Sequence, residues 1–494
     1  MGMFDFLRAK READVQVIKR SFRSYAAANV GRLFSDFMAS DSSADRELMS
    51  QLKVIRERCR DMARNDEYAA RFLQLRERNV VGERGINLQM KARDPDGSLD
   101  DYANDSIEVA WRRWGKLGNP TVDGRMDWVD CQKYVERTMQ RDGEAIAILV
   151  TNSDPDLPAV QLQFIEPDQL DEALNIRAKN GNQIRMGVEV DDAQRPVAYH
   201  FLSDHPGDHG YLKSAKREHI RVPAENVIHV FKQERVMQSR GVPSMHAALT
   251  GMKMLKGYRE AELVAARVSA SKIGFFTSPA GDGFLADDYD GSVPIMDAEP
   301  GSMHQLPQGV DFKSWDPEHP VSAYADFEKQ ILKGIASGLN VSYTSLANDL
   351  EGVSYSSIRE GSLSDRDEYR VAQQFLITHF IRPVFERWLK VTLLQRRINL
   401  PSEKLDKWYD GAVFRGRGWQ WVDPQKEMNA AIAGLKNGIL SMQDVANQYG
   451  RDVEETFAQI AQDKALAERF GIKFALEPYG AMQMPVEPDV TGGE

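Results

Sequence analysis

The sequence predicts an α+β protein in which a mixed body of helices and antiparallel strands carries several long helices. Five segments rich in Val, Ile, Phe and Tyr lie within residues 143–231 and are separated by turns of Asp, Asn, Gly and Pro. Most of these turns are too short to hold helices, so the sheet should be largely antiparallel. Apolar residues recur at helical spacing in 45–80, in 244–272 and in several stretches after 320.

Length and composition limit the class of protein. A chain of 494 residues predicts roughly two to four domains. Its formal net charge of −11 argues against a protein that coats nucleic acid, since such proteins cluster Lys and Arg. Only Cys59 and Cys131 are present, which fits a reducing compartment. Because no membrane span or signal peptide is recognisable, we expect a protein of the cytoplasm, or of a particle assembled there, without a membrane.

The first 240 residues are interpreted as an arm followed by the α+β body. Residues 1–44 are rich in Ser, Ala and Arg, and fit either an arm that docks on a neighbour or a frayed terminus. Helices are predicted over 45–80, which ends at Gly82, and over about 106–117. The strand segments then extend the body to about Arg240. They are 143–150, 159–166, 184–190, 196–202 and 226–231.

The segment 244–272 is predicted to be one long helix of about 43 Å, with Ser244 as its N-cap. Large apolar residues recur along one side, and small residues occupy the opposite flank. Small side chains let another backbone approach closely, so this flank is a candidate packing surface against copies of the chain. A core helix of a large monomer would have the same composition. The candidate packing residues are Ala247, Gly251, Ala261, Ala265 and Ser269.

Residues 273–312 contain no Lys or Arg and several acidic residues. This composition indicates either a small acidic lobe that meets a basic partner or a solvated loop. The candidate contact residues are Asp282, Asp287, Asp288 and Asp290. Helical spacing returns at 322–339, so the two helices flanking the lobe should lie side by side as a stalk.

A polar link at 342–357 precedes a helix that should run to about residue 395 with a kink at Pro383. The chain is again helical from Asp423 to about Phe470, with breaks at Gly438 and Gly450. Its tail is rich in Pro, Gly and Met, which favours disorder.

No motif for catalysis stands out, and we expect neither an enzyme nor a cofactor. The phosphate-binding loop, the H-E-x-x-H zinc motif, paired C-x-x-C and the G-x-S-x-G elbow are all missing. His205 and His209 are interpreted as part of a solvated loop, and His229 and His379 as structural residues. The alternative is a metal-dependent enzyme that processes nucleic acid. Its carboxylates would be Asp365, Asp367 and Glu368, although acids near a helix start also favour the helix dipole.

Several segments, in order, resemble the lambda-type portal proteins of tailed bacteriophages. They include NDEYAARFLQLRERNVVGERGINLQ at 65–89, IEPDQL at 165–170 and WQWVDPQKEMNAAIAGLKNGILS at 419–441. Two longer matches cover 229–270, around the long helix, and 334–389. No one segment carries a mechanism, but the ordered set covers most of the chain. The N-terminal forty residues and the tail after 475 show no such resemblance.

The resemblance implies a ring, usually of twelve copies, at one vertex of the capsid in the virion. Double-stranded DNA would enter through the ring, driven by the large subunit of the terminase, and leave through it without sequence-specific contacts. The implied partners are other copies of the chain, the terminase, a head–tail adaptor and the major capsid or scaffold protein. In this interpretation the acidic lobe faces the terminase and then the adaptor.

The resemblance also assigns the domains. They are an arm at 1–44, the wing at 45–240, the stem helix at 241–272, the clip at 273–318, a second stem helix at 319–340, the tunnel loop at 341–357, the long wing helix and its return at 358–422, the crown at 423–475 and a flexible tail at 476–494.

A channel through which DNA slides cannot bind phosphates tightly, because each neutralised phosphate adds affinity and therefore friction. The net negative charge of the chain fits this requirement. The tunnel-loop residues expected to face DNA are Asn348, Asp349, Glu351 and Gly352, the last giving the backbone freedom to shift. An ordinary surface loop would have a similar sequence.

Overall fold

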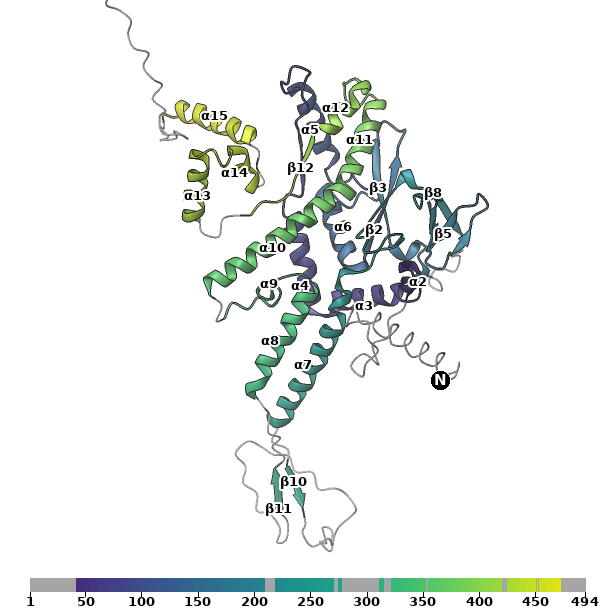
Figure 1. Cartoon of the computed structure of the whole chain (residues 1–494), viewed down its shortest axis with the longest axis vertical. Coiled ribbons are helices and arrows are strands. Elements are labelled where there is room, and N and C mark those ends of the chain that lie inside the picture. The colour runs from purple at the N-terminus through teal and green to yellow at the C-terminus, as the bar shows by residue number, and fades with distance from the viewer. Residues whose placement is uncertain are drawn as a thin grey trace, which may run out of the picture.

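A computed structural model of the chain describes residues 41–208, 218–270, 274–277, 311–314, 321–351, 354–419, 424–449, 451 and 453–471. A mixed body occupies the centre, and a pair of helices, α7 and α8, projects from it side by side (Figure 1). A further helical group, α13 to α15, lies beside the body in yellow (Figure 1). The predicted α+β class is confirmed within the described residues.

The first helical stretch is divided into four pieces rather than one. They are α2 (Ala44–Met49), α3 (Leu52–Asn65), α4 (Glu67–Arg76) and a π-helical turn, η2 (Glu77–Val81). The division between α3 and α4 has a local cause, because the Asp66 side chain accepts hydrogen bonds from the Tyr68 and Ala69 amides and caps α4. As predicted, the stretch ends at Gly82, whose φ is 80°.

The next two helices pack in the main core. The predicted helix at 106–117 begins earlier, as α5 (Asp101–Trp114), because the Asp100 side chain caps it. The second, α6 (Trp128–Asp142), was not predicted from the sequence, and it begins at a capping box between Asp127 and Asp130. Tryptophans of α5 and α6 meet edge to face in the core, with the ring centroids of Trp111 and Trp128 5.3 Å apart.

The strands within residues 144–231 form two antiparallel sheets, as the short turns predict. The first has the order β3 (Val160–Ile165), β2 (Glu144–Thr151), β9 (Val227–Phe231). The second runs in sequence order through β4 (Ile176–Arg177), β5 (Gln183–Arg185), β6 (Val188–Val190), β7 (Pro196–Leu202) and β8 (His219–Pro223). The segment predicted as one strand at 184–190 is a hairpin, because Met186 and Gly187 take φ values of 47° and 86° and turn the chain.

The first helix of the hairpin that leaves the body begins later than predicted. Residues Ser244–Ala247 form a 3₁₀ turn, η6, and the α-helix α7 covers Leu249–Ala270. Beyond it, β10 (Gly274–Thr277) pairs antiparallel with β11 (Asp311–Ser314), and α8 (Val321–Gly338) returns to the body. The acidic residues proposed for the lobe, and Gly450, lie outside the described residues.

The link after α8 is not fully irregular, since it contains the short helix α9 (Tyr343–Ala347). The predicted long helix exists as α10 (Tyr355–Leu376) and α11 (Arg382–Leu394). A π-helical segment, η7 (Ile377–Ile381), joins them directly ahead of Pro383. Because proline cannot donate the helical hydrogen bond at its position, the break falls there, as expected for the kink.

The remaining elements complete the body and the helical group. Strand β1 (Asn87–Met90) pairs antiparallel with β12 (Ala412–Arg415), far along the chain. Short helical pieces are η3 (Pro167–Gln169), η4 (Pro206–Asp208), η5 (Ala224–Asn226), η8 (Ser402–Lys404) and α12 (Leu405–Asp410). The last helices are α13 (Pro424–Lys436), α14 (Met442–Gln448) and α15 (Val453–Arg469), and the predicted break at Gly438 is present with φ of 69°.

Candidate functional site: the helical hairpin and its base

The base of the hairpin is held in a hydrophobic cluster of its own. Met252 and Leu255 of α7 and Leu332 and Ile335 of α8 are 4% exposed or less. They pack with buried side chains of α3 and α4, among them Phe72. The apolar residues at the start of this helix therefore mark the side that faces α8 and the body, whereas Leu263, predicted as part of the same series, is more than half exposed.

The small residues of α7 do not all share one environment. Ala247 and Ala261 are exposed, Gly251 and Ala265 are half-buried, and the side chain of Ser269 lies outside the described part. A Cβ atom added to Gly251 would lie 3.1 Å from Ile335 Cγ1, so this glycine faces α8 of the same chain. Packing of this flank against another copy remains a prediction.

The surface of the hairpin also carries large apolar residues. Met254, Leu263, Val264 and Phe327 are each more than half exposed. Aromatic rings join the two helices, with the Tyr258 centroid 5.7 Å from that of Tyr324. A hairpin with exposed apolar residues of this size has surface that another protein chain could cover.

The link between α8 and α10 is attached to α8 by a charged side chain. Asp349 Oδ2 lies 3.3 Å from Lys329 Nζ of α8 and accepts a hydrogen bond of 2.8 Å from the Tyr343 hydroxyl. Hydrogen bonds from the Glu351 amide, Tyr343 and Lys329 lower the pKa of Asp349. Asn348 and Glu351 are exposed, and Gly352 lies outside the described residues. That these residues face DNA is a proposal.

Asp365 anchors the same link to α10. Its buried carboxylate accepts hydrogen bonds of 2.8 and 2.7 Å from the Ser342 amide and hydroxyl. The Ser345 hydroxyl donates a third, of 2.7 Å. Asp367 pairs instead with Arg370 at 2.7 Å, and Glu368 lies 3.8 Å from Arg76. The three carboxylates of the enzyme alternative thus have separate structural partners, which favours the structural interpretation.

Replacement of Asp365 by Ala should loosen residues 342–351 and lower the free energy of unfolding by about 2 kcal/mol, because hydrogen bonds to a buried charge are lost. Amide hydrogen exchange across the link measures the loosening. Asp367→Ala is the matched control, since the Asp367 side chain is 74% exposed. DNA cleavage with magnesium or manganese that either change abolished would instead favour the enzyme.

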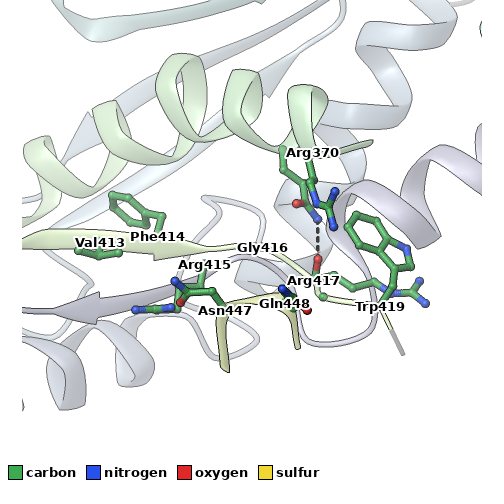
Figure 2. Close-up of a pocket in the computed structure, with 11 residues that line it drawn as sticks. Arg370, Val413, Phe414, Arg415, Gly416, Arg417, Trp419, Asn447 and Gln448 are labelled. Carbon is green, nitrogen blue, oxygen red and sulfur yellow. Dashed lines mark hydrogen bonds between the residues drawn. The ribbon is translucent and has the colours of Figure 1, made fainter. Parts of the chain in front are cut away.

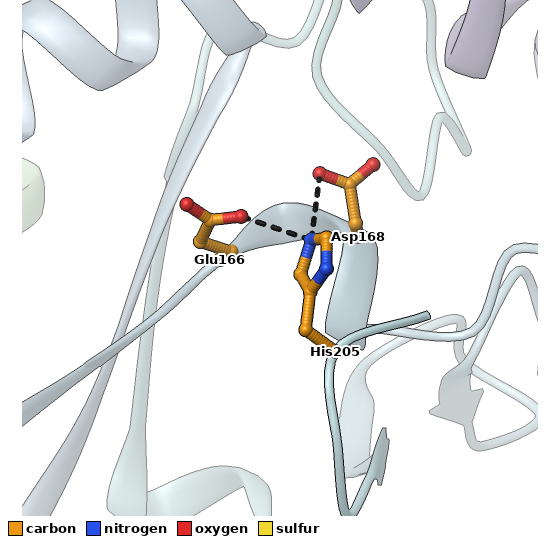
Figure 3. A group of neighbouring side chains, drawn as sticks. All are labelled: Glu166, Asp168 and His205. Atoms are coloured by element: carbon orange, nitrogen blue, oxygen red, sulfur yellow. Dashed lines mark ion pairs between the residues drawn. The ribbon is translucent and has the colours of Figure 1, made fainter. Parts of the chain in front are cut away.

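His205 is not simply solvated, which corrects the expectation for this loop. Its Nε2 atom lies 3.0 Å from Glu166 Oε2 and 3.8 Å from Asp168 Oδ2 (Figure 3). Glu166, Asp168 and His205 are the group of described residues close enough to hold a metal ion. However, Asp168 is already held by Arg56 at 3.1 Å and Arg60 at 2.5 Å, and a metal would have to compete with both cations. The arrangement therefore fits an ion-pair cluster. His209 lies outside the described residues.

A buried ionic network lies where the hairpin joins the body, and the sequence did not predict it. Arg240, with no exposed surface, donates to Glu144 and to three backbone carbonyls, those of Pro167, Leu170 and Met186, at 2.8 to 3.0 Å. Arg56 donates to the same carboxylate at 3.0 Å. Arg240 comes just before the turn into α7, so these contacts tie the hairpin to the body.

The electrostatics of Glu144 follow from its burial and from its neighbours Arg240 and His229. Burial opposes its ionisation, but Arg240 and His229 more than offset that penalty and hold the pKa of Glu144 well below its usual value. His229 Nε2 lies 2.8 Å from the carboxylate, which confirms the structural role predicted for this histidine. In the sequence, Glu144 is only a single Glu at the start of a predicted strand. Nothing in that pattern indicates its partners.

Comparison with known proteins gives the family. A family model described as "Phage portal protein, lambda family" matches residues 30–373. The chain is 36% identical to a "Probable portal protein" of Halomonas phage phiHAP-1, over 94% of this chain and 91% of that protein. It is 22% identical to "Portal protein B" of Escherichia phage lambda, over 92% of each. A chain in the neck of an empty gene transfer agent particle is similar over 85% of this chain and 98% of that chain, with 12% identity and a TM-score of 0.45.

An α+β body that carries a long helical hairpin, matched along nearly its whole length by portal sequences, defines the class as bacteriophage portal proteins. The chain belongs to the lambda family of phage portal proteins. The predicted resemblance is thereby confirmed. In the part of the chain that the structure describes, no helix has the length and apolar character needed to cross a membrane.

Proposed function

We propose that copies of this chain form a ring at one vertex of the capsid, through which double-stranded DNA enters during packaging and leaves at ejection. The observation that carries the proposal is the family match over residues 30–373, which includes the whole hairpin. The exposed apolar residues of α7 and α8 support it, because neighbouring copies would cover them.

The proposal assigns roles to the parts of the chain. The body before residue 241 is the wing, α7 and α8 are the stem, residues 273–318 are the clip, and α13 to α15 lie in the crown. The clip, with Asp282, Asp287, Asp288 and Asp290, meets the terminase and later the head–tail adaptor. The wing meets the major capsid or scaffold protein. The link with Asn348, Asp349, Glu351 and Gly352 faces DNA.

The negative net charge supports passage of DNA rather than its retention. A lining that neutralised many phosphates would bind DNA with high, salt-dependent affinity. The described acidic residues of the link offer no such neutralisation, and the charge of Asp349 is partly balanced by Lys329 within the chain. The ring would then act as a conduit and supply no chemical step of its own.

Electron microscopy of the purified full-length protein tests the proposal. Axial views should show rings with a central hole, and the count of subunits in them gives the copy number. Met254→Glu combined with Val264→Glu places charge on the exposed stem side and should weaken the rings, whereas Leu117→Glu, on an exposed loop after α5, should not. A compact monomer under every assembly condition would refute the proposal.

A further inference from the structure

A pocket lies between α10, the segment that continues from β12 and the crown helix α14 (Figure 2). Its volume is about 340 Å³. The groups that matter here are Arg370 of α10, Arg417 and Trp419 after β12, and Asn447 and Gln448 of α14. We call this site the arginine pocket. Figure 2 shows the Arg370 and Arg417 side chains on the same side as the Trp419 ring.

Arg417 carries one of the positive charges of the pocket. This half-buried side chain donates to two neutral oxygens, the Arg78 carbonyl at 2.6 Å and Asn79 Oδ1 at 3.3 Å. Burial and the nearby guanidinium groups of Arg78 and Arg366 lower the pKa of Arg417. Like charges held this close repel one another, and an anion placed among them would relieve the repulsion.

Arg370 brings a second cation to the same wall. Its guanidinium carbon lies 5.6 Å from the centre of the Trp419 ring, which is the geometry of a cation–π contact. It also pairs with Asp367 at 2.7 Å, but both side chains are more than half exposed. An exposed pair of this kind contributes little and exchanges readily, so Arg370 can turn to another anion.

The wall behind these side chains is fixed before any ligand arrives. Gln373 is 7% exposed and donates from Nε2 to the Val80 carbonyl at 3.1 Å and to the Arg417 carbonyl at 3.2 Å. The chain approaches it so closely at Gly416 that an added Cβ would lie 2.6 Å from Gln373 Cδ. The backbone that presents Arg417 is therefore held in place, which reduces the entropy lost on binding.

We propose that the arginine pocket binds the phosphodiester backbone of duplex DNA. The inference rests on the proposed function, which brings this polyanion to the ring. Guanidinium groups, and the side-chain amides of Asn447 and Gln448 on the facing wall, are typical phosphate contacts, and they carry no information on base sequence. Three arginines line each pocket, Arg370, Arg415 and Arg417, and so few cations keep the contact weak enough per subunit for DNA to move.

The test compares two double variants of equal charge change in the full-length protein. Arg370→Gln with Arg417→Gln removes two of the three arginines that line the pocket and leaves Arg415 in place. Arg112→Gln with Arg195→Gln removes two cations whose side chains are 71% and 79% exposed elsewhere on the body. Fluorescence anisotropy of a labelled short duplex of mixed sequence is measured over a series of salt concentrations, with inorganic phosphate as a competitor.

The pocket variant should bind the duplex more weakly, and the slope of log K against log salt should become shallower by about 1 to 2, close to 0.9 for each lost phosphate contact. The control variant should keep the parental slope. Arg417→Lys retains the charge and should retain most of the slope, which separates loss of charge from damage to the fold. If the pocket variant changes only the response to high inorganic phosphate and leaves the affinity for the duplex unchanged, the pocket is a site for free anions. That result would contradict the proposal.

Equal slopes in the pocket and control variants would overturn the proposal. So would loss of oligomers in the pocket variant at unchanged DNA affinity, because the pocket would then bind a neighbouring copy. Imaging separates these results from failure of the proposed function. Rings with no change of slope refute the pocket alone, and a changed slope without rings refutes the ring alone.

Discussion

Replacement of Gly241 by Ala should destabilise the protein by more than about 3 kcal/mol, beyond the usual range for overpacking. A Cβ atom at this position would lie 2.1 Å from the Gly143 carbonyl oxygen and 2.7 Å from Phe231 Cβ. Two stretches of backbone meet here, so the clash cannot be relieved by rotation of a side chain. Urea denaturation should show a lower midpoint, and soluble yield should fall.

Gly257→Ala is the matched control for this change. Gly257 lies within α7, and an added Cβ would meet nothing within 4 Å in the described structure. Alanine exceeds glycine in helix propensity by about 1 kcal/mol, so this variant should be as stable as the parent or more stable. If Gly241→Ala and Gly257→Ala unfold at the same urea concentration, the close backbone approach does not hold the hairpin to the body.

Replacement of Glu144 by Gln should lower the free energy of unfolding by about 3 to 5 kcal/mol, because it leaves buried cations without their carboxylate. Arg56 and Arg240 both lie within 3.0 Å of Glu144 and neither is exposed. The control is Asp191→Asn, which removes a surface partner of Arg195 and should cost less than about 1 kcal/mol. Similar losses in the two variants would show that the network contributes nothing special.

The pH dependence of stability provides a second measure of Glu144. Because its pKa is lowered in the folded chain, its contribution is present above the unfolded pKa of about 4.3 and is lost as pH falls below that value. The parent should therefore lose more stability than Glu144→Gln when urea midpoints are compared at neutral and at acidic pH. Equal losses in parent and variant would contradict this assignment.

The sequence predicts those parts of the fold in which buried residues are apolar and recur at a regular spacing. The spacing of Met252 and Leu255 indicates the hairpin because apolar residues alone form its buried side. Helix α6 escaped notice because it buries polar residues, with Gln132 and Glu136 both fully buried. Gln132 bonds to the Ile86 backbone, and Glu136 pairs with Arg76 at 2.8 Å. Such partners are distant in sequence and leave no periodic trace.

The sequence also predicted only part of the candidate site. The link after α8 was identified by its polar composition, but its attachment through Asp365 depends on a contact across turns that composition does not encode. The arginine pocket joins Arg370 to residues after β12 and to α14, and only folding brings them together. The ring, the domain boundaries and the DNA-facing residues remain predictions from family and sequence.

The pairing of β1 with β12 joins Met90 to Ala412. A strand from the first part of the chain therefore cannot pair until a strand near the end of the chain has been made. During synthesis on a ribosome, the intervening hairpin and both larger sheets emerge before this last strand is available. Contacts this distant in sequence slow folding and leave an unpaired strand edge exposed meanwhile. Truncated translation products that stop before residue 412 should therefore lack a finished body and be open to aggregation and to proteases.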